Sequence, residues 1–268
     1  MTKTSVSVTS PIKPNIEYWA EKIDLAAAMR WAARHNWHEA IANHFSFAVS
    51  DDGSEFIMNA YGRHWSKAQA SDVLLLNANQ SPKHMGQTVD PTAFAIHSAM
   101  HRNLPQARCI LHVHPKYTTA LSCLKNPEML PIDQNTMRFY QRVAIDQGFN
   151  GMGLGDEAER LTTMLGDKSI LLMGNHGVMV TGETIAHAFD ELYYFERAAE
   201  TLMTAYASGQ DLAVVSDEVA EKTMRQWLAY PNFAEKHFAA LKAILDEEEP
   251  DYRQLSLLES RKSLLLKN

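Results

Sequence analysis

The chain has 268 residues, of which 46% are hydrophobic and 21% are charged, a composition typical of globular rather than disordered or fibrous proteins. The formal net charge is −7 and no basic run is present, so we exclude nucleic acid as a partner. The longest aliphatic runs have four residues, whereas a membrane span needs about 20, and the start of the chain lacks the apolar stretch of a signal peptide. We therefore expect a cytoplasmic protein without membrane contact.

The sequence predicts one folded domain between two terminal segments. Residues 1–14 are rich in Ser, Thr and Pro and are expected to be disordered. No stretch between residues 15 and 245 has the length and composition of a linker, which predicts a single domain there. Residues 246–268 are acidic and then leucine-rich. We interpret the acidic part as a solvated helix end and the leucines as a candidate subunit interface.

In the first half of the chain, turn and capping signals separate the periodic segments. The sequence Asp-Asp-Gly-Ser at residues 51–54 lies between two alternating runs, which is a strong hairpin signal. Asp90 followed by proline opens a helix, because an aspartate side chain accepts hydrogen bonds from first-turn amides and proline is tolerated at the first helical position. The elements expected here are a helix over 16–34, strands over 45–50, 55–60 and 71–77, and a helix over 90–103.

The second half alternates strands and helices before a helical end. Residues 108–114 form an apolar run stopped by Pro115, which predicts a buried strand. The further elements expected are helices over 117–124, 134–145 and 156–165, strands over 170–173 and 178–181 around a Gly-Asn-His-Gly turn, and helices thereafter. Strands joined both by hairpins and by helix crossovers imply an α/β fold, with a mixed or antiparallel sheet layered by helices and a long helical C-terminal third.

Three histidines have the spacing of metal ligands. Side chains two apart on a strand point to the same face, so the imidazoles of His112 and His114 can converge on one point. The same pattern also fits two hydrogen-bonded histidines at a strand end. His176, in the turn between two apolar strands, adds a third imidazole from distant sequence, and three protein ligands leave an open position for a substrate. Three neutral imidazoles favour Zn²⁺, with Mn²⁺, Fe²⁺ and Co²⁺ as alternatives.

Six stretches, spread in family order over about residues 20 to 210, resemble the class II aldolase/adducin family. They are Asn43-His44-Phe45-Ser46-Phe47, Asn59-Ala60-Tyr61-Gly62, Ile96-His97-Ser98-Ala99, Leu111-His112-Val113-His114-Pro115, Arg138-Phe139-Tyr140 and Leu172-Met173-Gly174-Asn175-His176-Gly177. The resemblance implies an α/β/α sandwich around a mostly antiparallel sheet and a homotetramer with active sites between subunits. It also implies one divalent metal ion per chain, held by His112, His114 and His176.

The chain departs from the sugar-phosphate aldolases of this family and is more similar to the bacterial adducin-like branch. Those aldolases have an acid/base glutamate four residues before the helix histidine, and counting back from His97 this chain has Ala93. Their phosphate cup uses a Gly-Asn pair, a Thr-Gly pair and two serines. The aligned residues here are Asn43-His44, Tyr61-Gly62 and Pro91-Thr92. The resemblance therefore implies that the phosphate cup is lost and that the substrate is unphosphorylated.

The remaining polar residues at these positions suit a carboxylate or a phenolate. The candidates for substrate binding are Asn43, His44, Ser46, Tyr61, Gly62 and Arg63. His97 is our first choice as proton donor, because an imidazole with a near-neutral pKa suits acid/base work, and the alternative is a hydrogen-bonded core histidine. His101, one helical turn on, either faces the same pocket or is exposed. Tyr140 falls where the family places an aromatic segment near the neighbouring subunit's site, so it is a second candidate donor or only packs.

These observations leave three classes of function. We expect a divalent-metal-dependent lyase that breaks a carbon–carbon bond of a small unphosphorylated hydroxy, oxo or hydroxy-aromatic carboxylic acid, by decarboxylation or aldol cleavage through a metal-stabilised enolate. One alternative is a sugar or sugar-phosphate aldolase, an epimerase, an isomerase or a dehydratase on the same metal site. The other is a non-catalytic adducin-like interaction module. A module would not need three metal ligands, so the enzyme is preferred.

Overall fold

The computed structural model describes residues 17–80, 88–148 and 156–254. Within these ranges the chain folds around one sheet whose strand order is β3-β2-β1-β4-β7-β6-β5. The strands are β1 (His44–Ala48), β2 (Glu55–Asn59), β3 (Val73–Asn77), β4 (Cys109–Val113), β5 (Val143–Asp146), β6 (Ile170–Met173) and β7 (Gly177–Gly182). All neighbouring strands pair antiparallel except β5 and β6, which are parallel. The expectation of a mostly antiparallel sheet is confirmed.

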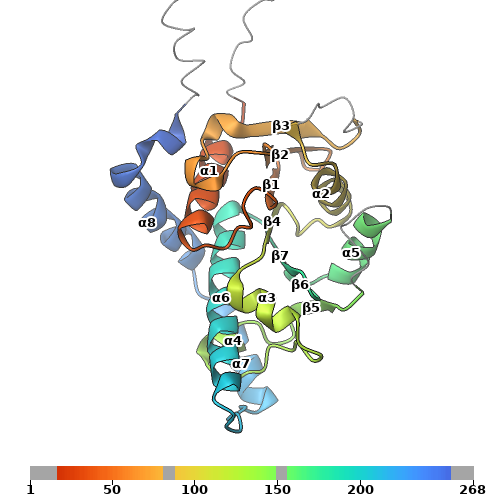
Figure 1. The fold of residues 1–268 in the computed structure, drawn as a ribbon, viewed down its shortest axis with the longest axis vertical. Helices are drawn as coiled ribbons and strands as arrows, with labels where there is room; N and C mark the ends of the chain where they lie inside the picture. The colour runs from red at the N-terminus through yellow and green to blue at the C-terminus, as the bar shows by residue number, and fades with distance from the viewer. Residues whose placement is uncertain (1–16, 81–87, 149–155, 255–268) are drawn as a thin grey trace, which may run out of the picture.

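Helices cover both faces of the sheet, which makes the predicted α/β/α sandwich (Figure 1). They are α1 (Trp19–Arg34), α2 (Pro91–Asn103), α3 (Lys116–Ser122), α4 (Gln134–Met137), α5 (Glu157–Leu165), α6 (Ile185–Ala207), α7 (Asp217–Leu228) and α8 (Phe233–Glu248). The long helical C-terminal third is α6 to α8. None of the helices in the described ranges is long and apolar enough to cross a membrane.

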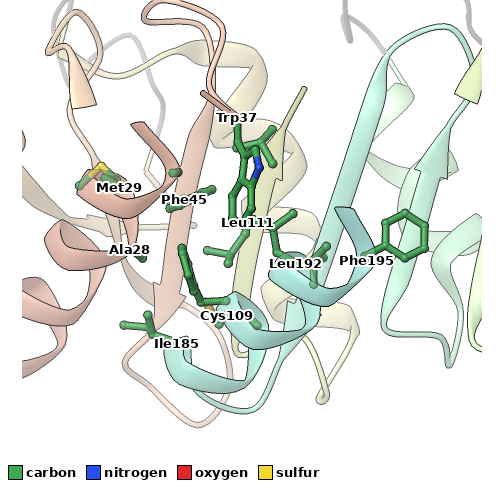
Figure 2. Packing of buried hydrophobic residues seen from close by; sticks show 14 of the residues in the cluster. Ala28, Met29, Trp37, Phe45, Cys109, Leu111, Ile185, Leu192 and Phe195 are labelled. Carbon is green, nitrogen blue, oxygen red and sulfur yellow. The ribbon is translucent and has the colours of Figure 1, made fainter. Parts of the chain in front are cut away.

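Strand alternation divides the core between the two faces. Phe45 and Leu111 pack with α1 and α6 on one face, together with Leu192, as Figure 2 shows. Ile110 and Met179 point the other way and pack against the apolar sides of α2 and α5. Because side chains alternate along a strand, the polar residues between them in sequence also segregate by face. His44, Ser46 and His112 therefore all point toward the α2 layer.

The predicted helix over 134–145 is partly wrong. Only Gln134–Met137 is helical as α4, and Val143–Asp146 forms β5, the parallel edge strand beside β6. Between them Gln141 has φ 58°, a left-handed conformation that an α-helix does not continue through. The four residues of β5 are too few to show the alternation of a strand, so the sequence pattern predicts that the helix continues through them.

The acidic segment after residue 245 begins as the predicted solvated helix end, since residues 246–248 are the exposed last residues of α8, but the residues that follow pack against α1. Arg30 of α1 is only 1% exposed, and it pairs with Glu249 at 2.5 Å and with Asp251 at 2.8 Å. A buried guanidinium requires such partners, because an unpaired buried charge is strongly destabilising. Tyr252 is completely buried beside them. The predicted disordered segment 1–14 and the leucine-rich part of the tail lie outside the described residues.

A buried carboxylate fixes the chain just after the His-x-His strand. Glu196 of α6 accepts hydrogen bonds from the amides of Tyr117 and Thr118 and from the Thr118 hydroxyl, at 2.6–2.9 Å. These are first-turn amides of α3, which have no partner within their own helix. Glu196 thus joins α6 to the start of α3, two residues beyond His114, and limits how far that histidine can move.

We expect Glu196→Ala to lower the free energy of unfolding by about 3 kcal/mol, because it leaves two amides and a hydroxyl buried without partners. Chemical denaturation measures this change. Glu200→Ala, on the same helix, is the control: the Glu200 carboxylate makes an exposed pair with Arg197, so this substitution should cost less than about 0.5 kcal/mol. Equal losses in the two variants would contradict the capping role.

Candidate metal centre

Three histidines from two separate parts of the chain meet at one edge of the sheet. The potential ligand nitrogens of His112, His114 and His176 all lie within 4.8 Å of one another. Each pair of rings has its centroids 4.8–4.9 Å apart. His112 is the last but one residue of β4, and His176 lies in the turn between β6 and β7. The structure thus brings together the three residues that the sequence singled out as ligands.

Local backbone geometry explains why the turn reaches the strand end. Asn175 has φ 57°, the left-handed conformation that a tight turn needs and that asparagine tolerates. Gly177 follows, and a Cβ there would lie 2.6 Å from the Cδ2 of His114 and 2.6 Å from the Val113 carbonyl oxygen. Only glycine allows this approach. The Asn-His-Gly sequence is therefore what lets His176 reach His112 and His114, and we call these three histidines the triad.

The hydrogen bonding of His112 leaves the correct nitrogen free for a metal. Its Nδ1 lies 3.0 Å from the carbonyl oxygen of Val178. Because a carbonyl only accepts, Nδ1 carries the proton and Nε2 carries a lone pair. The Nε2 of His114 lies 3.1 Å from the Nε2 of His112. A backbone acceptor behind a ligating histidine is the usual arrangement in metal sites, so these residues fit a divalent ion.

Burial keeps the triad in the neutral form that binds metal. Loss of solvation lowers the pKa of His112 well below 6.5, and the nearby rings of His44, His176 and His114 add to the effect. The pKa of His114 is lowered to about 4 by burial and by His176. The pKa of His176 is also lowered, chiefly by burial. Imidazoles must be neutral to coordinate a metal, and these stay neutral at pH 7.

A second group of polar side chains extends from the triad into the α2 layer. His44 on β1 pairs across the sheet with His112 on β4, and their ring centroids are 4.7 Å apart. Nδ1 of His44 lies 2.6 Å from Nε2 of His97. The Ser46 hydroxyl lies 2.5 Å from Nδ1 of His97 and 2.7 Å from Nε2 of His101. These four residues, which we call the buried chain, are all at most 9% exposed.

The site and the fold can be compared with known proteins. The family model described as Class II Aldolase and Adducin N-terminal domain matches residues 23–203. This chain belongs to the class II aldolase and adducin family. An adducin-related protein of Schizosaccharomyces pombe is 30% identical over 259 residues, which cover 90% of this chain and 75% of that protein.

Two solved structures resemble the fold closely. An aldolase II superfamily protein from Pseudomonas syringae is 31% identical with a TM-score of 0.79, and the match covers 92% of this chain and 98% of the other. The L-fuculose 1-phosphate aldolase from Glaciozyma antarctica PI12 is 25% identical with a TM-score of 0.75, over 92% of this chain and 97% of that enzyme. Membership of the family therefore rests on sequence and on fold.

Where its sugar-phosphate relatives are expected to bind phosphate, this member of the class II aldolase and adducin family has its own carboxylate. Oδ1 of Asp90 accepts hydrogen bonds from the Thr92 amide at 2.9 Å, the Ala93 amide at 2.9 Å and the Thr92 hydroxyl at 2.6 Å. Pro91 has no amide hydrogen. Although burial opposes it, these bonds lower the pKa of Asp90, so the carboxylate stays charged. The start of α2 thus already holds an anion.

The predicted substrate residues do not all lie in the same place. Asn43 and His44 line a hollow of about 10 Å³ with Tyr61, Asp90 and Ala93, which is room for about one water molecule. The side-chain nitrogen of Asn43 is buried there and has no hydrogen-bond partner among the residues that the structure describes. Ser46 belongs to the buried chain. Gly62 has φ 90° and follows the exposed Tyr61. The exposed Arg63 pairs with Asp72.

The two predicted proton donors differ in their surroundings. His97 is completely buried and both its ring nitrogens are engaged, by His44 and by Ser46. Tyr140 follows α4, and its hydroxyl hydrogen-bonds to Asp217 of α7, which together with loss of solvation raises the pKa of the phenol. None of the contacts described for Tyr140 is with the triad. His101 belongs to the buried chain and is not exposed. Its Nδ1 lies 2.8 Å from the backbone carbonyl oxygen of Ala107, a contact that the sequence gives no sign of.

We expect Gly177→Ala to weaken zinc binding by about 10- to 100-fold, because the new methyl group displaces His114 from the triad. Competition with a chromogenic chelator measures the dissociation constant. Gly182→Ala is the matched control on the same strand: its Cβ would lie 2.8 Å from the Ala188 amide nitrogen, so it also strains the backbone, but at the other end of β7. Its zinc affinity should match that of the parent. Unchanged affinity in Gly177→Ala would contradict this account of the turn.

Proposed function

We propose that the protein is a divalent-metal-dependent carbon–carbon lyase that acts on a small hydroxy, oxo or hydroxy-aromatic carboxylic acid without a phosphate group. The observation that carries the proposal is the histidine triad, because the Val178 carbonyl leaves the Nε2 of His112 unprotonated beside two further imidazoles. An adducin-like module without catalysis would not need that arrangement. Membership of the family is consistent with either role.

The triad would hold one ion, and zinc suits three imidazoles best. When bound, a divalent ion supplies Lewis-acid stabilisation of the negative charge that develops on substrate oxygens as the carbon–carbon bond breaks. His114 and His176 are only partly buried, so the ligand side of the triad is open to a substrate. The protein's own task is to keep three neutral imidazoles converged, through Gly177 and Val178.

The substrate class follows from what surrounds the triad. The amides that could hold a phosphate at the start of α2 already donate to Asp90, and a second anion there would meet a negative charge. The buried side-chain NH2 group of Asn43 offers two N–H donors, which suits the oxygens of a small acid. These groups favour a small acid over a bulky phosphate dianion.

Bond cleavage leaves an electron pair on carbon, and one proton must return to it in either decarboxylation or aldol cleavage. Because Ala93 carries no carboxylate, an imidazole has to take up the proton of the substrate hydroxyl and return it to the carbon. His97 reaches the triad only through His44, so in this proposal His44 contacts the substrate and His97 acts behind it. Tyr140 serves as the alternative donor if a homotetramer brings it into a neighbouring subunit's site.

A sugar-phosphate aldolase is the second candidate, and the similarity to the Glaciozyma enzyme favours it. The two candidate functions differ in the anionic group of the substrate, which is a carboxylate for the lyase and a phosphate for the sugar-phosphate aldolase. Purified, zinc-loaded protein should turn over 2-hydroxy or hydroxy-aromatic acids, measured by release of carbon dioxide or aldehyde, and should leave fuculose- and ribulose-type phosphates unchanged. Asp90→Ser keeps a helix cap and removes the charge, so it should bind phosphate more tightly than the parent. Efficient cleavage of a phosphorylated sugar by the parent would reverse the assignment of the substrate.

Metal binding has its own test. Elemental analysis of the parent should find about one divalent ion per chain, while His112→Ala and His176→Ala should bind zinc more than about 100-fold more weakly and lose turnover. Both variants should stay folded, because the triad lies at the edge of the core. His187→Ala, a change at an exposed histidine on α6, is the control and should retain the ion. Full metal content in either triad variant would mean that the site is misassigned.

A further inference from the structure

The buried chain can carry its protons in one of two directions, and the direction decides what His44 presents to a substrate. Its members in order are His44, His97, Ser46 and His101. A neutral imidazole has one N–H donor and one lone pair, and a hydroxyl donates once. Each link can therefore point toward the triad or away from it, and fixing the donor at the His101 end fixes the links that follow.

A backbone carbonyl at the far end fixes that direction. Nδ1 of His101 lies 2.8 Å from the carbonyl oxygen of Ala107. Because the carbonyl only accepts, Nδ1 carries the proton, and in a neutral ring Nε2 then carries the lone pair. The reverse arrangement would set a ring lone pair against the carbonyl oxygen at hydrogen-bond distance in a buried site. Such an unsatisfied contact is costly.

The remaining links follow one by one. The Ser46 hydroxyl donates to Nε2 of His101, so its oxygen is free to accept. Nδ1 of His97 donates to that oxygen, and Nε2 of His97 then accepts from Nδ1 of His44. All three histidines carry their proton on Nδ1. Nε2 of His44 is left with a lone pair, on a ring that stands 4.7 Å from the ring of His112 and lines the hollow with Asn43.

The rings are neutral because they are out of water. Burial lowers the pKa of His101 to about 4 and that of His97 well below its ordinary value, and His44 is likewise withdrawn from water, at 9% exposed. Asp90 lines the same hollow as His44, and its Oδ1 is engaged by the amides and hydroxyl at the start of α2. None of the hydrogen bonds described for the chain involves a carboxylate.

We propose that the Ala107 carbonyl, acting through His101, Ser46 and His97, holds His44 with its proton on Nδ1, so that Nε2 accepts a hydrogen bond from a hydroxyl group of the substrate. His101 and Ser46 are then positioning residues for His44. The inference rests on the proposed function in one respect, that the substrate enters beside the triad. It narrows the substrate class to acids that carry a hydroxyl donor. It also explains why the buried chain is built from hydrogen-bonding side chains, which packing alone would not require.

The proton order is tested on metal-free protein, without any substrate. Long-range ¹H–¹⁵N correlation spectra of histidine-labelled protein distinguish a protonated from a bare ring nitrogen, and His44→Gln assigns the His44 signals. The parent should show Nδ1 of His44 protonated and Nε2 bare. A proton on Nε2 of His44 in the parent would overturn the inference.

His101→Phe removes the N–H that the Ala107 carbonyl accepts, and an aromatic ring fits there because the His101 ring already packs against Phe56 with their centroids 5.1 Å apart. With the direction no longer fixed, a second His44 signal with Nε2 protonated should appear. His35→Phe is the matched control, since His35 is another largely buried histidine among aromatic rings and lies outside the chain. It should leave the His44 signals unchanged. A single, parent-like His44 state in a folded His101→Phe protein would show that the carbonyl does not set the direction.

Ser46 gives a second and independent arm. Ser46→Ala should disorder the His44 tautomer as His101→Phe does, and Ser46→Thr, which keeps the hydroxyl on a β-strand, should restore the parent spectrum. If the threonine variant does not fold, the His101 arm decides alone. A single, parent-like His44 tautomer in Ser46→Ala would contradict the role of the buried chain.

Binding of two small acids to the zinc-loaded protein separates this inference from the proposed function. Glycolate carries the hydroxyl and acetate lacks it. The parent's preference for glycolate should fall by several-fold to about tenfold in His101→Phe, while acetate binding stays the same. An unchanged preference, with the tautomer as expected, would refute the acceptor role of His44. Correct tautomers and altered preference in a protein that cleaves no hydroxy acid would instead refute the lyase and leave the proton order standing.

Discussion

A neutral, buried imidazole has one N–H to donate and one lone pair to present, and this constraint decides the character of the whole site. Two backbone carbonyls take the N–H groups at its ends. Val178 accepts from His112 and so exposes a lone pair toward the other two ligands. Ala107 accepts from His101 and sets the direction of a chain that ends at His44. Neither carbonyl can donate, so neither arrangement can invert without losing a buried hydrogen bond.

The sheet makes this arrangement possible because it has already sorted side chains by face. Phe45 and Leu111 go to the larger core under α1 and α6, and the polar residues beside them go to the α2 side. The register that pairs His44 with His112 then puts a member of the histidine triad and the end of the buried chain side by side. The apolar packing on one face and the polar site on the other both result from this alternation of side chains. A one-residue slip of β1 would therefore remove Phe45 from the core and His44 from the site.

The sequence was informative where a residue's role depends on its near neighbours. The spacing of His112 and His114, the hairpin at residues 51–54 and the cap at Asp90 are local patterns, and the structure has all three. Prediction failed at residues 143–146, since a short parallel edge strand depends on β6, which comes more than 20 residues later. Tertiary pairing there overrides the local pattern.

The candidate site was predictable as a list of residues but not as a set of roles. His97 was identified from its place on the helix, yet its burial depends on how closely α2 lies against β1. The role of Ala107 could not be found in this way, because every residue has a carbonyl and the sequence does not show which one meets a histidine. The helix cap at Asp90 was predicted correctly, but its consequence for anion binding appears only once the amides that it occupies are counted.

That consequence links the two ends of α2. At its N-terminus Asp90 supplies the negative charge that the helix dipole favours, so the helix is stabilised whether or not a ligand is present. About two and three turns later, His97 and His101 of the same helix form part of the buried chain. A helix that must first bind phosphate to satisfy its amides would be free to shift when empty. Because α2 carries its own anion, the imidazoles that it holds against β1 keep their positions and their proton order before any substrate arrives.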